Sequence, residues 1–269
     1  MQRELPELKK RKIGLVAISY DSPDILKEFA ARKQITFPLL SDIGSMTIRA
    51  YGILNETVKP DSFAYGIPAP GTLVLDGTGK IIAKYAEADF RERITIASIL
   101  ERQTGLPAGP TTKIDVKHLS VSLRPSNPSV SSGQKITLSI EGILPSKMHV
   151  YAPGVKGYKP ISWTLDESSA YKFSDTEFPA SEMLRLPVIK ETVPVYRGRF
   201  VIRRDLTIAM PPVLRPVLDA DGNFLVKGKF SYQACDEKEC YLPESALVQW
   251  KVHWEPFDSI RSAAPIQHK

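Results

Sequence analysis

Two residues of this chain have the chemistry for redox work, and they lie close together. Cys235 and Cys240 are the two cysteines among 269 residues, and four residues separate them in the stretch YQACDEKECYLP. The flanking segments, LVKGKFSYQAC and YLPESALVQW, alternate as strands do, which predicts that the cysteines bracket the turn of a hairpin. Opposed strand positions have Cα atoms ~4.5–5.5 Å apart, within the ~4.4–6.8 Å that a disulfide requires.

Three uses of such a pair compete: thiol–disulfide exchange, a structural bond and metal binding. A disulfide that closes so short a loop removes little conformational entropy from the unfolded chain, so it adds little to the stability of the folded protein. A hairpin tip is exposed, and exposed disulfides are the kind that exchange. Zinc usually takes four ligands from paired motifs, whereas this chain has one cysteine pair and four scattered histidines. We therefore favour exchange, expect no metal site, and keep a structural disulfide as the alternative.

The loop between the cysteines is acidic. It holds Asp236, Glu237 and Glu239 against a single cation, Lys238. Negative charge nearby disfavours the thiolate form of a cysteine. Exchange is therefore expected to depend on a partner that presents its own low-pKa thiol.

Length and composition predict a soluble globular protein with room for two domains. Hydrophobic residues make up 42% of the chain and charged residues 25%, and the net charge of +6 is only mildly basic, so no nucleic-acid partner is expected. The KKRK run at 9–12 is predicted to end a helix, where cations complement the helix dipole. No apolar run approaches the ~18 residues that span a bilayer, and no signal-peptide pattern is present.

The first part of the chain alternates strand and helix patterns, which predicts an α/β domain over residues 1–104. The run at 13–20 is apolar and β-branched, as in a strand buried on both faces. Ser22 and Pro23 are typical of a helix N-terminus. The expected elements are a strand at 13–20, helices at 22–33, 45–52 and 89–105, and a pair of strands within 71–85 around an Asp-Gly-Thr-Gly turn.

The second part has a different pattern. Residues 105–113 are rich in Gly and Pro and predict a linker. Seven short alternating segments follow between turn residues, which predicts an antiparallel, immunoglobulin-like β-sandwich over 114–256, with a tail at 257–269. The expected strands lie in 118–126, 134–142, 148–154, 161–168, 197–206, 225–235 and 245–255.

The first domain resembles a known family. LVAISYDSPDILKEFAARKQITFPLLSDIGSMTIRAYGIL and IPAPGTLVLDGTGKIIAKY together resemble the alkyl hydroperoxide reductase/thiol-specific antioxidant branch of the thioredoxin-fold peroxiredoxins, over about residues 13–103. The resemblance places Pro70 where thioredoxin folds carry a cis-proline beside the active site. Ala69–Pro70 is thus a candidate cis bond, with an ordinary turn proline as the alternative.

That family needs a reactive cysteine at the start of its first long helix, where the helix N-terminus favours thiolate. This chain has no cysteine before Cys235, and the family's first strand is also missing. Neighbouring strands would then keep unpaired backbone groups. We expect the missing strand and cysteine to be encoded upstream of Met1.

The second domain resembles the N-terminal periplasmic domain of the DsbD family of thiol:disulfide interchange proteins. HVYAPG, PVYRGRFVI and KFSYQACDEKECYLPES carry the likeness, although five residues rather than four commonly separate the cysteines in that family. The resemblance implies that Cys240 forms the mixed disulfide with a partner and that Cys235 resolves it. It also implies a pocket walled by tyrosines and a cap in segment 172–187 with Phe178 as its apolar contact. The candidate wall residues are Tyr151, Tyr232 and Tyr241.

These observations predict a thiol–disulfide oxidoreductase of antioxidant type that exchanges electrons through Cys235–Cys240. The redox-active disulfide is its own reaction centre and no cofactor is expected. The expected partner is a thioredoxin-like protein thiol or disulfide, with peroxide as a substrate of the full-length protein. The alternative is a non-catalytic binding module with an inert disulfide. Disulfide use favours an oxidising, extracytoplasmic compartment.

Overall fold

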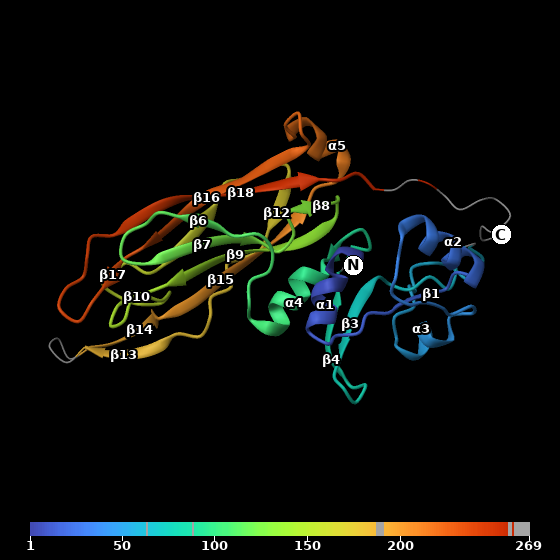
Figure 1. Cartoon of the computed structure of the whole chain (residues 1–269), viewed down its shortest axis with the longest axis horizontal. Coiled ribbons are helices and arrows are strands. Elements are labelled where there is room, and N and C mark those ends of the chain that lie inside the picture. The colour runs from blue at the N-terminus through green and yellow to red at the C-terminus, as the bar shows by residue number, and fades with distance from the viewer. Residues whose placement is uncertain (63, 88, 187–190, 258–259, 261–269) are drawn as a thin grey trace. The chain divides into compact units, whose positions relative to one another are not determined.

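The computed structural model describes residues 1–62, 64–87, 89–186, 191–257 and 260. The chain divides into two compact units at Ile96/Ala97, so that Met1–Ile96 forms an N-terminal unit and Ala97–Phe257 a second, β unit. The first is an α/β region and the second is mostly β-sheet (Figure 1). Apart from Phe257 and Ile260, the predicted tail lies outside the described residues.

The N-terminal unit contains a β-α-β segment and a hairpin. Strands β1 and β2 pair in parallel, and helix α2 connects them in the chain. Strands β3 and β4 pair as an antiparallel hairpin. The Ser22 hydroxyl caps α2 by accepting the Ile25 N–H at 3.4 Å, as the sequence predicted. The elements are η1 Gln2–Glu4, α1 Leu5–Lys10, β1 Ala17–Ser19, α2 Pro23–Lys33, β2 Leu39–Ser41, α3 Met46–Ala50, β3 Gly71–Leu75, β4 Ile81–Ala86 and β5 Arg93–Ile94.

In this unit one expectation was wrong, and one open alternative is decided. Strand β1 is short and only half-buried, because β2 is its one strand partner among the described residues. The Ala69–Pro70 bond is trans, since the described residues contain no cis peptide. Trans is the lower-energy isomer of an X-Pro bond, and Ala69 is exposed and Pro70 half-buried, so no close packing holds the cis form.

The β unit is built from three sheets, with strand orders β12-β15-β9-β7-β6, β11-β16-β18-β8 and β13-β14-β10-β17. All seven expected strands are present, and the structure adds β6, β8, β12, β13 and β14. The elements are α4 Ile96–Thr104, β6 Thr112–Ile114, β7 Ser120–Pro125, β8 Ser129–Val130, β9 Gln134–Ile143, β10 His149–Tyr151, β11 Ser162–Leu165, β12 Tyr171–Phe173, β13 Glu182–Leu186, β14 Glu191–Arg197, β15 Arg199–Ile208, α5 Pro211–Leu214, η2 Arg215–Val217, β16 Asn223–Tyr232, β17 Ala234–Cys235 and β18 Glu244–Trp254.

The helix expected over 89–105 starts later, at Ile96. Residues 93–94 form the short strand β5 instead. The run Ile94, Thr95, Ile96 is β-branched, and such side chains favour extended backbone over helix. The boundary between the two compact units falls at the first turn of this helix.

The core of the β unit lies between the sheet β12-β15-β9-β7-β6 and the sheet β11-β16-β18-β8. Strand β16 alternates buried and exposed side chains over most of its length, as a strand with one face on a core does. Trp163 of β11 and Trp250 of β18 meet with ring centroids 5.3 Å apart inside this core. The smaller sheet, β13-β14-β10-β17, gathers at one end of the unit (Figure 1). That end carries both cysteines.

Candidate functional site

The disulfide forms where the chain passes from one sheet to another. Strand β16 pairs with β18 up to Tyr232, and after Gln233 the chain joins β10 as β17. The loop then reverses, with the Asp236 N–H donating to the Glu239 carbonyl at 2.9 Å. Cys240 therefore returns opposite Cys235 as an isolated antiparallel bridge, and the two sulfurs are bonded at 2.10 Å. The predicted hairpin and bond are confirmed.

The two cysteines differ in exposure. Cys235 is only 1% exposed and packs in an apolar cluster, whereas Cys240 is exposed. The expectation that both cysteines would lie on an exposed tip was wrong for Cys235. Strand β17 pairs with β10, and the Cys235 side chain packs in the apolar cluster. Of the two cysteines, Cys240 is therefore the one that lies at the surface.

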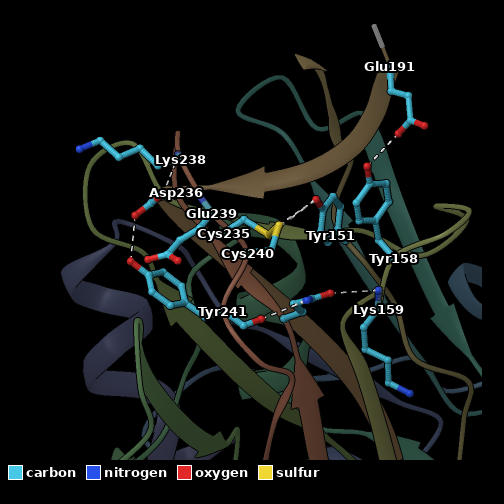
Figure 2. Close-up of a disulfide and its surroundings, with 11 residues drawn as sticks. Tyr151, Tyr158, Lys159, Glu191, Cys235, Asp236, Lys238, Glu239, Cys240 and Tyr241 are labelled. Atoms are coloured by element: carbon cyan, nitrogen blue, oxygen red, sulfur yellow. Dashed lines mark hydrogen bonds between the residues drawn. A yellow bond between two sulfur atoms is a disulfide. The ribbon is translucent and has the colours of Figure 1, made fainter. Parts of the chain in front are cut away.

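Tyr151 brings a hydroxyl to the disulfide. Its oxygen lies 3.4 Å from Cys240 Sγ and 3.6 Å from Cys235 Sγ (Figure 2). Burial, and to a lesser degree Tyr158 and Glu191, raise the pKa of Tyr151 to about 12. The Tyr151 ring stacks on Tyr158 at 4.3 Å, and Tyr158 donates its own hydroxyl to Glu191 at 2.8 Å. Tyr151 therefore keeps its proton at neutral pH and presents a hydrogen-bond donor to the sulfurs.

Asp236 organises the loop between the cysteines. Its Oδ1 accepts the N–H groups of Lys238 at 2.7 Å and Glu239 at 2.9 Å, and its Oδ2 accepts the Tyr241 hydroxyl at 2.8 Å (Figure 2). These donors, the Glu239 N–H foremost, lower the pKa of Asp236 to about 2. Tyr241 also stacks on His118 with centroids 3.9 Å apart. One carboxylate thus fixes both the turn and the ring beside Cys240.

The pKa of Asp236 predicts a titration of the loop in acid. A carboxylate whose pKa is lowered on folding stabilises the folded loop above its ordinary pKa of 3.8, and this stabilisation is lost as the pH falls through about 2. The amide proton shifts of Lys238 and Glu239 are expected to titrate together with a midpoint of about 2, measured by NMR. Asp236→Asn serves as the control and should remove this titration. A midpoint at the ordinary value for aspartate would contradict the arrangement.

A hairpin covers the buried sulfur. Strands β13 and β14 pair antiparallel, and one face of this hairpin packs with Tyr151 and Cys235. The apolar side chains on that face are Leu184, Leu186, Val193 and Val195. Part of the predicted cap segment, 172–187, therefore lies beside the disulfide as strand β13, while Pro187 lies outside the described residues.

Three further predicted residues are Phe178, Tyr232 and Pro70. Phe178 packs against the main core. Tyr232 is fully buried in that core and donates its hydroxyl to the Lys117 carbonyl. Pro70 belongs to the N-terminal unit. Among the described residues, no group of three or more His, Cys, Asp or Glu is placed to hold a metal ion.

Sequence reasoning missed Tyr158 and the β13–β14 hairpin. The alternation of Leu184 and Leu186, then of Val193 and Val195, is a strand signal that could have indicated the hairpin. No local signal indicates Tyr158, because it lies in a loop and reaches the site only by stacking on Tyr151.

Comparison with known proteins agrees with this division of the chain. Residues 1–84 match the AhpC/TSA family, and residues 120–251 match the family described as thiol:disulfide interchange protein DsbD, N-terminal. Alkyl hydroperoxide reductase E of Mycobacterium tuberculosis is 36% identical over 90 residues, which are 32% of this chain and 52% of that protein. The protein of the same name from Mycobacterium bovis gives the same values. The chain thus spans about half the length of these curated relatives.

Two solved structures are also similar. The N-terminal periplasmic domain of ScsB from Proteus mirabilis aligns at 14% identity and a TM-score of 0.36, over 53% of this chain and 50% of that one. The reduced N-terminal domain of DsbD from Neisseria meningitidis aligns at 13% identity and a TM-score of 0.30, over 43% and 82%. No helix in the described part of the chain has the length and apolar character needed to cross a membrane.

The chain therefore combines an N-terminal AhpC/TSA, peroxiredoxin region with a C-terminal DsbD N-terminal domain. Both resemblances stated from the sequence are confirmed. Both families suggest thiol–disulfide roles, and the disulfide of the chain lies in the second region.

Proposed function

We propose that this protein is a thiol–disulfide oxidoreductase that exchanges electrons with a thioredoxin-like protein through Cys235 and Cys240. The observation that carries this proposal is the asymmetry of the bond: an exposed Cys240 joined to a buried Cys235, with the Tyr151 hydroxyl against both sulfurs. The incoming thiol has one sulfur within reach, and the leaving sulfur has a hydrogen-bond donor beside it.

The exchange proceeds in two balanced steps. A thiolate of the partner attacks Cys240 Sγ, a bond forms between these two sulfurs, and the Cys235–Cys240 bond breaks with its electron pair on Cys235 Sγ. The second thiolate of the partner then attacks the partner's own sulfur in the mixed disulfide and releases Cys240 as a thiolate. The partner dithiol is oxidised to a disulfide, and Cys235 and Cys240 are reduced.

The surroundings of the bond suit exchange with a protein that brings its own thiolate. Asp236, Glu237 and Glu239 lie in the loop that leads to the exposed Cys240, and their negative charge opposes formation of a thiolate there. The β13–β14 hairpin covers Cys235 and leaves approach from the Cys240 side. Cys240 therefore serves as the sulfur attacked by the partner, and Cys235 as the leaving group. In the reverse direction, Cys235 resolves the mixed disulfide.

The proposal also covers the folds of the two units and the path that the electrons take after exchange. The N-terminal unit is a thioredoxin-like, peroxiredoxin-related domain and the β unit an immunoglobulin-like sandwich, supported by the family matches and the strand pairings. In this relay, the reduced cysteine pair passes electrons to the peroxidatic cysteine of a peroxiredoxin-like site, with peroxide as the final acceptor. The disulfide itself favours an oxidising, extracytoplasmic compartment.

A trapping experiment tests the exchange. In Cys235→Ser, Cys240 is first converted to a mixed disulfide with thionitrobenzoate. The thiolate of a thioredoxin-like protein that lacks its second cysteine is expected to attack Cys240 Sγ, release thionitrobenzoate and leave a stable mixed disulfide under non-denaturing conditions. Cys240→Ser is the matched control, because it leaves only the buried Cys235 and should yield little adduct. Equal adduct from both variants, or none from Cys235→Ser, would overturn the assignment of the attacked sulfur.

Peroxide consumption tests the relay. A fusion of this chain to a segment that carries a peroxidatic cysteine is expected to consume peroxide at the expense of a thioredoxin-like reductant. Cys240→Ser in that protein should abolish the reductant-dependent turnover. Equal rates for the two proteins would contradict a relay through the β unit while leaving exchange at Cys240 intact.

The burial of Cys235 in an apolar cluster favours one alternative, a binding module held by an inert disulfide. A redox titration separates the two functions. Structural disulfides have midpoint potentials below about −300 mV, and exchange-active ones lie higher. A value in the lower range would support the binding module.

A further inference from the structure

His149 is a buried histidine beside the disulfide that the exchange steps above do not use. It begins strand β10 and is 4% exposed. Its Nε2 is buried and has no hydrogen-bond partner among the described residues. Buried polar atoms in proteins are nearly always partnered, so an unpartnered nitrogen next to a reactive bond points to a second state in which it is used.

The register of the sheet places His149 next to the leaving sulfur. His149 is the cross-strand partner of Cys235 in the β10–β17 pair. Directly opposed residues of an antiparallel pair project to the same face of the sheet, with Cβ atoms ~4.5–5.5 Å apart. Tyr151, two residues further along β10, shares this face, and its ring meets the His149 ring edge-on at 5.4 Å. The imidazole thus adjoins both Cys235 and the tyrosine that contacts its sulfur.

The charges that face His149 come from three other segments. Arg197 of β14 is its cross-strand partner on the other side, Glu182 of β13 forms an ion pair with Arg197 at 3.3 Å, and Asp236 follows β17. Burial, followed by Arg197, lowers the pKa of His149 below its ordinary value, while Asp236 and Glu182 act in the opposite direction. In the disulfide form the imidazole is therefore neutral at neutral pH.

We propose that His149 is the redox-linked proton site of this disulfide: it is neutral while Cys235 and Cys240 are bonded, and it binds a proton when Cys235 becomes a thiolate. This inference rests on the proposed function. When the partner thiolate attacks Cys240, the S–S bond breaks with its electron pair on Cys235 Sγ. A proton from solvent then binds the unpartnered imidazole nitrogen, so that a thiolate and an imidazolium replace two neutral groups.

The physical reason is the burial of Cys235. A thiolate formed at a 1% exposed position has little water to stabilise it, and the Tyr151 hydroxyl supplies one hydrogen bond. An opposite charge within ~4–6 Å shifts a pKa by roughly 1–3 units toward the charged form. Cys235 and His149 therefore raise each other's charged populations and titrate as a pair in the reduced protein. His149 thereby stabilises the reduced form.

NMR titration of the wild-type protein tests this linkage directly. The imidazole resonances of His149 are followed against pH in the oxidised protein and after chemical reduction by a phosphine. The pKa of His149 is expected to rise by about one unit or more on reduction. The matched control is His253, which contacts Asn223 at the other end of the strand pair β16–β18 and whose imidazole resonances should be the same in the oxidised and reduced protein. An unchanged His149 pKa would overturn the inference.

The midpoint potential gives a second readout. Loss of a tenfold stabilisation of the reduced form lowers the potential of a two-electron couple by about 30 mV. His149→Phe is expected to lower the potential by that amount or more at neutral pH, and His253→Phe to leave it unchanged. Chemical reduction needs no protein partner, so these results stand even if exchange with thioredoxin-like proteins fails. Normal exchange with an unchanged potential would refute the role of His149 alone.

Discussion

Replacing Tyr151 with phenylalanine is expected to slow reduction of the Cys235–Cys240 bond by a thioredoxin-like dithiol roughly 10- to 100-fold. The hydroxyl lies 3.6 Å from Cys235 Sγ, the sulfur that leaves as a thiolate. A hydrogen bond to a charged group contributes about 1.5–3 kcal/mol, and each 1.36 kcal/mol corresponds to about a tenfold change in rate. The measurement is stopped-flow kinetics of reduction under pseudo-first-order conditions.

The matched control is Tyr158→Phe. Tyr158 is the neighbouring ring of the stack, but its hydroxyl bonds to Glu191 rather than to sulfur. Because the pKa of Tyr151 is about 12, its proton is retained from about pH 6 to about pH 9, and the ratio of wild-type to variant rates should stay constant over that range. Equal slowing by both variants would show that the effect does not depend on the contact between the Tyr151 hydroxyl and the sulfurs.

Replacing Glu101 with alanine is expected to lower the free energy of unfolding of the β unit by about 3–5 kcal/mol. Glu101 of α4 is fully buried, and its carboxylate accepts the Arg203 guanidinium at 2.9 Å and the Ala108 N–H at 3.1 Å. It also bonds the hydroxyl of Ser139, the strand neighbour of Arg203 in the β9–β15 pair. Removing the Glu101 carboxylate leaves the mostly buried Arg203 guanidinium without its ion-pair partner. An uncompensated buried charge lowers stability strongly.

Chemical denaturation followed by tryptophan fluorescence measures this loss, since Trp163 and Trp250 lie in the core of the same unit. Glu177→Gln is the control. The side chain of Glu177 is half exposed, and it pairs at 3.0 Å with Arg102, which lies on α4 as Glu101 does. Exposed ion pairs contribute at most about 1 kcal/mol to the free energy of unfolding. If the two variants lose the same stability, the buried carboxylate does not fasten α4 to the sheet.

Strand positions in the second half of the chain follow from local alternation, and all seven expected strands appear. The first half was less predictable. The run at 13–20 has the composition of a strand buried on both faces, yet β1 has one strand partner among the described residues and stays half exposed. Burial depends on which strands lie alongside, and a segment's own residues do not encode that.

The sequence by itself determined that two cysteines face each other across a short hairpin, because strand alternation on both sides and a four-residue loop leave little other geometry. It also indicated the two family regions, whose motifs are contiguous in the chain. Only the tertiary structure decided which sulfur is buried and which residues surround it. Tyr151, His149 and strand β14 meet Cys235 through strand pairing. The separations of Arg197 and His149 from Cys235 in the paired strands β14, β10 and β17 are 38 and 86 positions. Pairing between distant strands is set by the packing of the whole sheet, and local pattern carries no record of it.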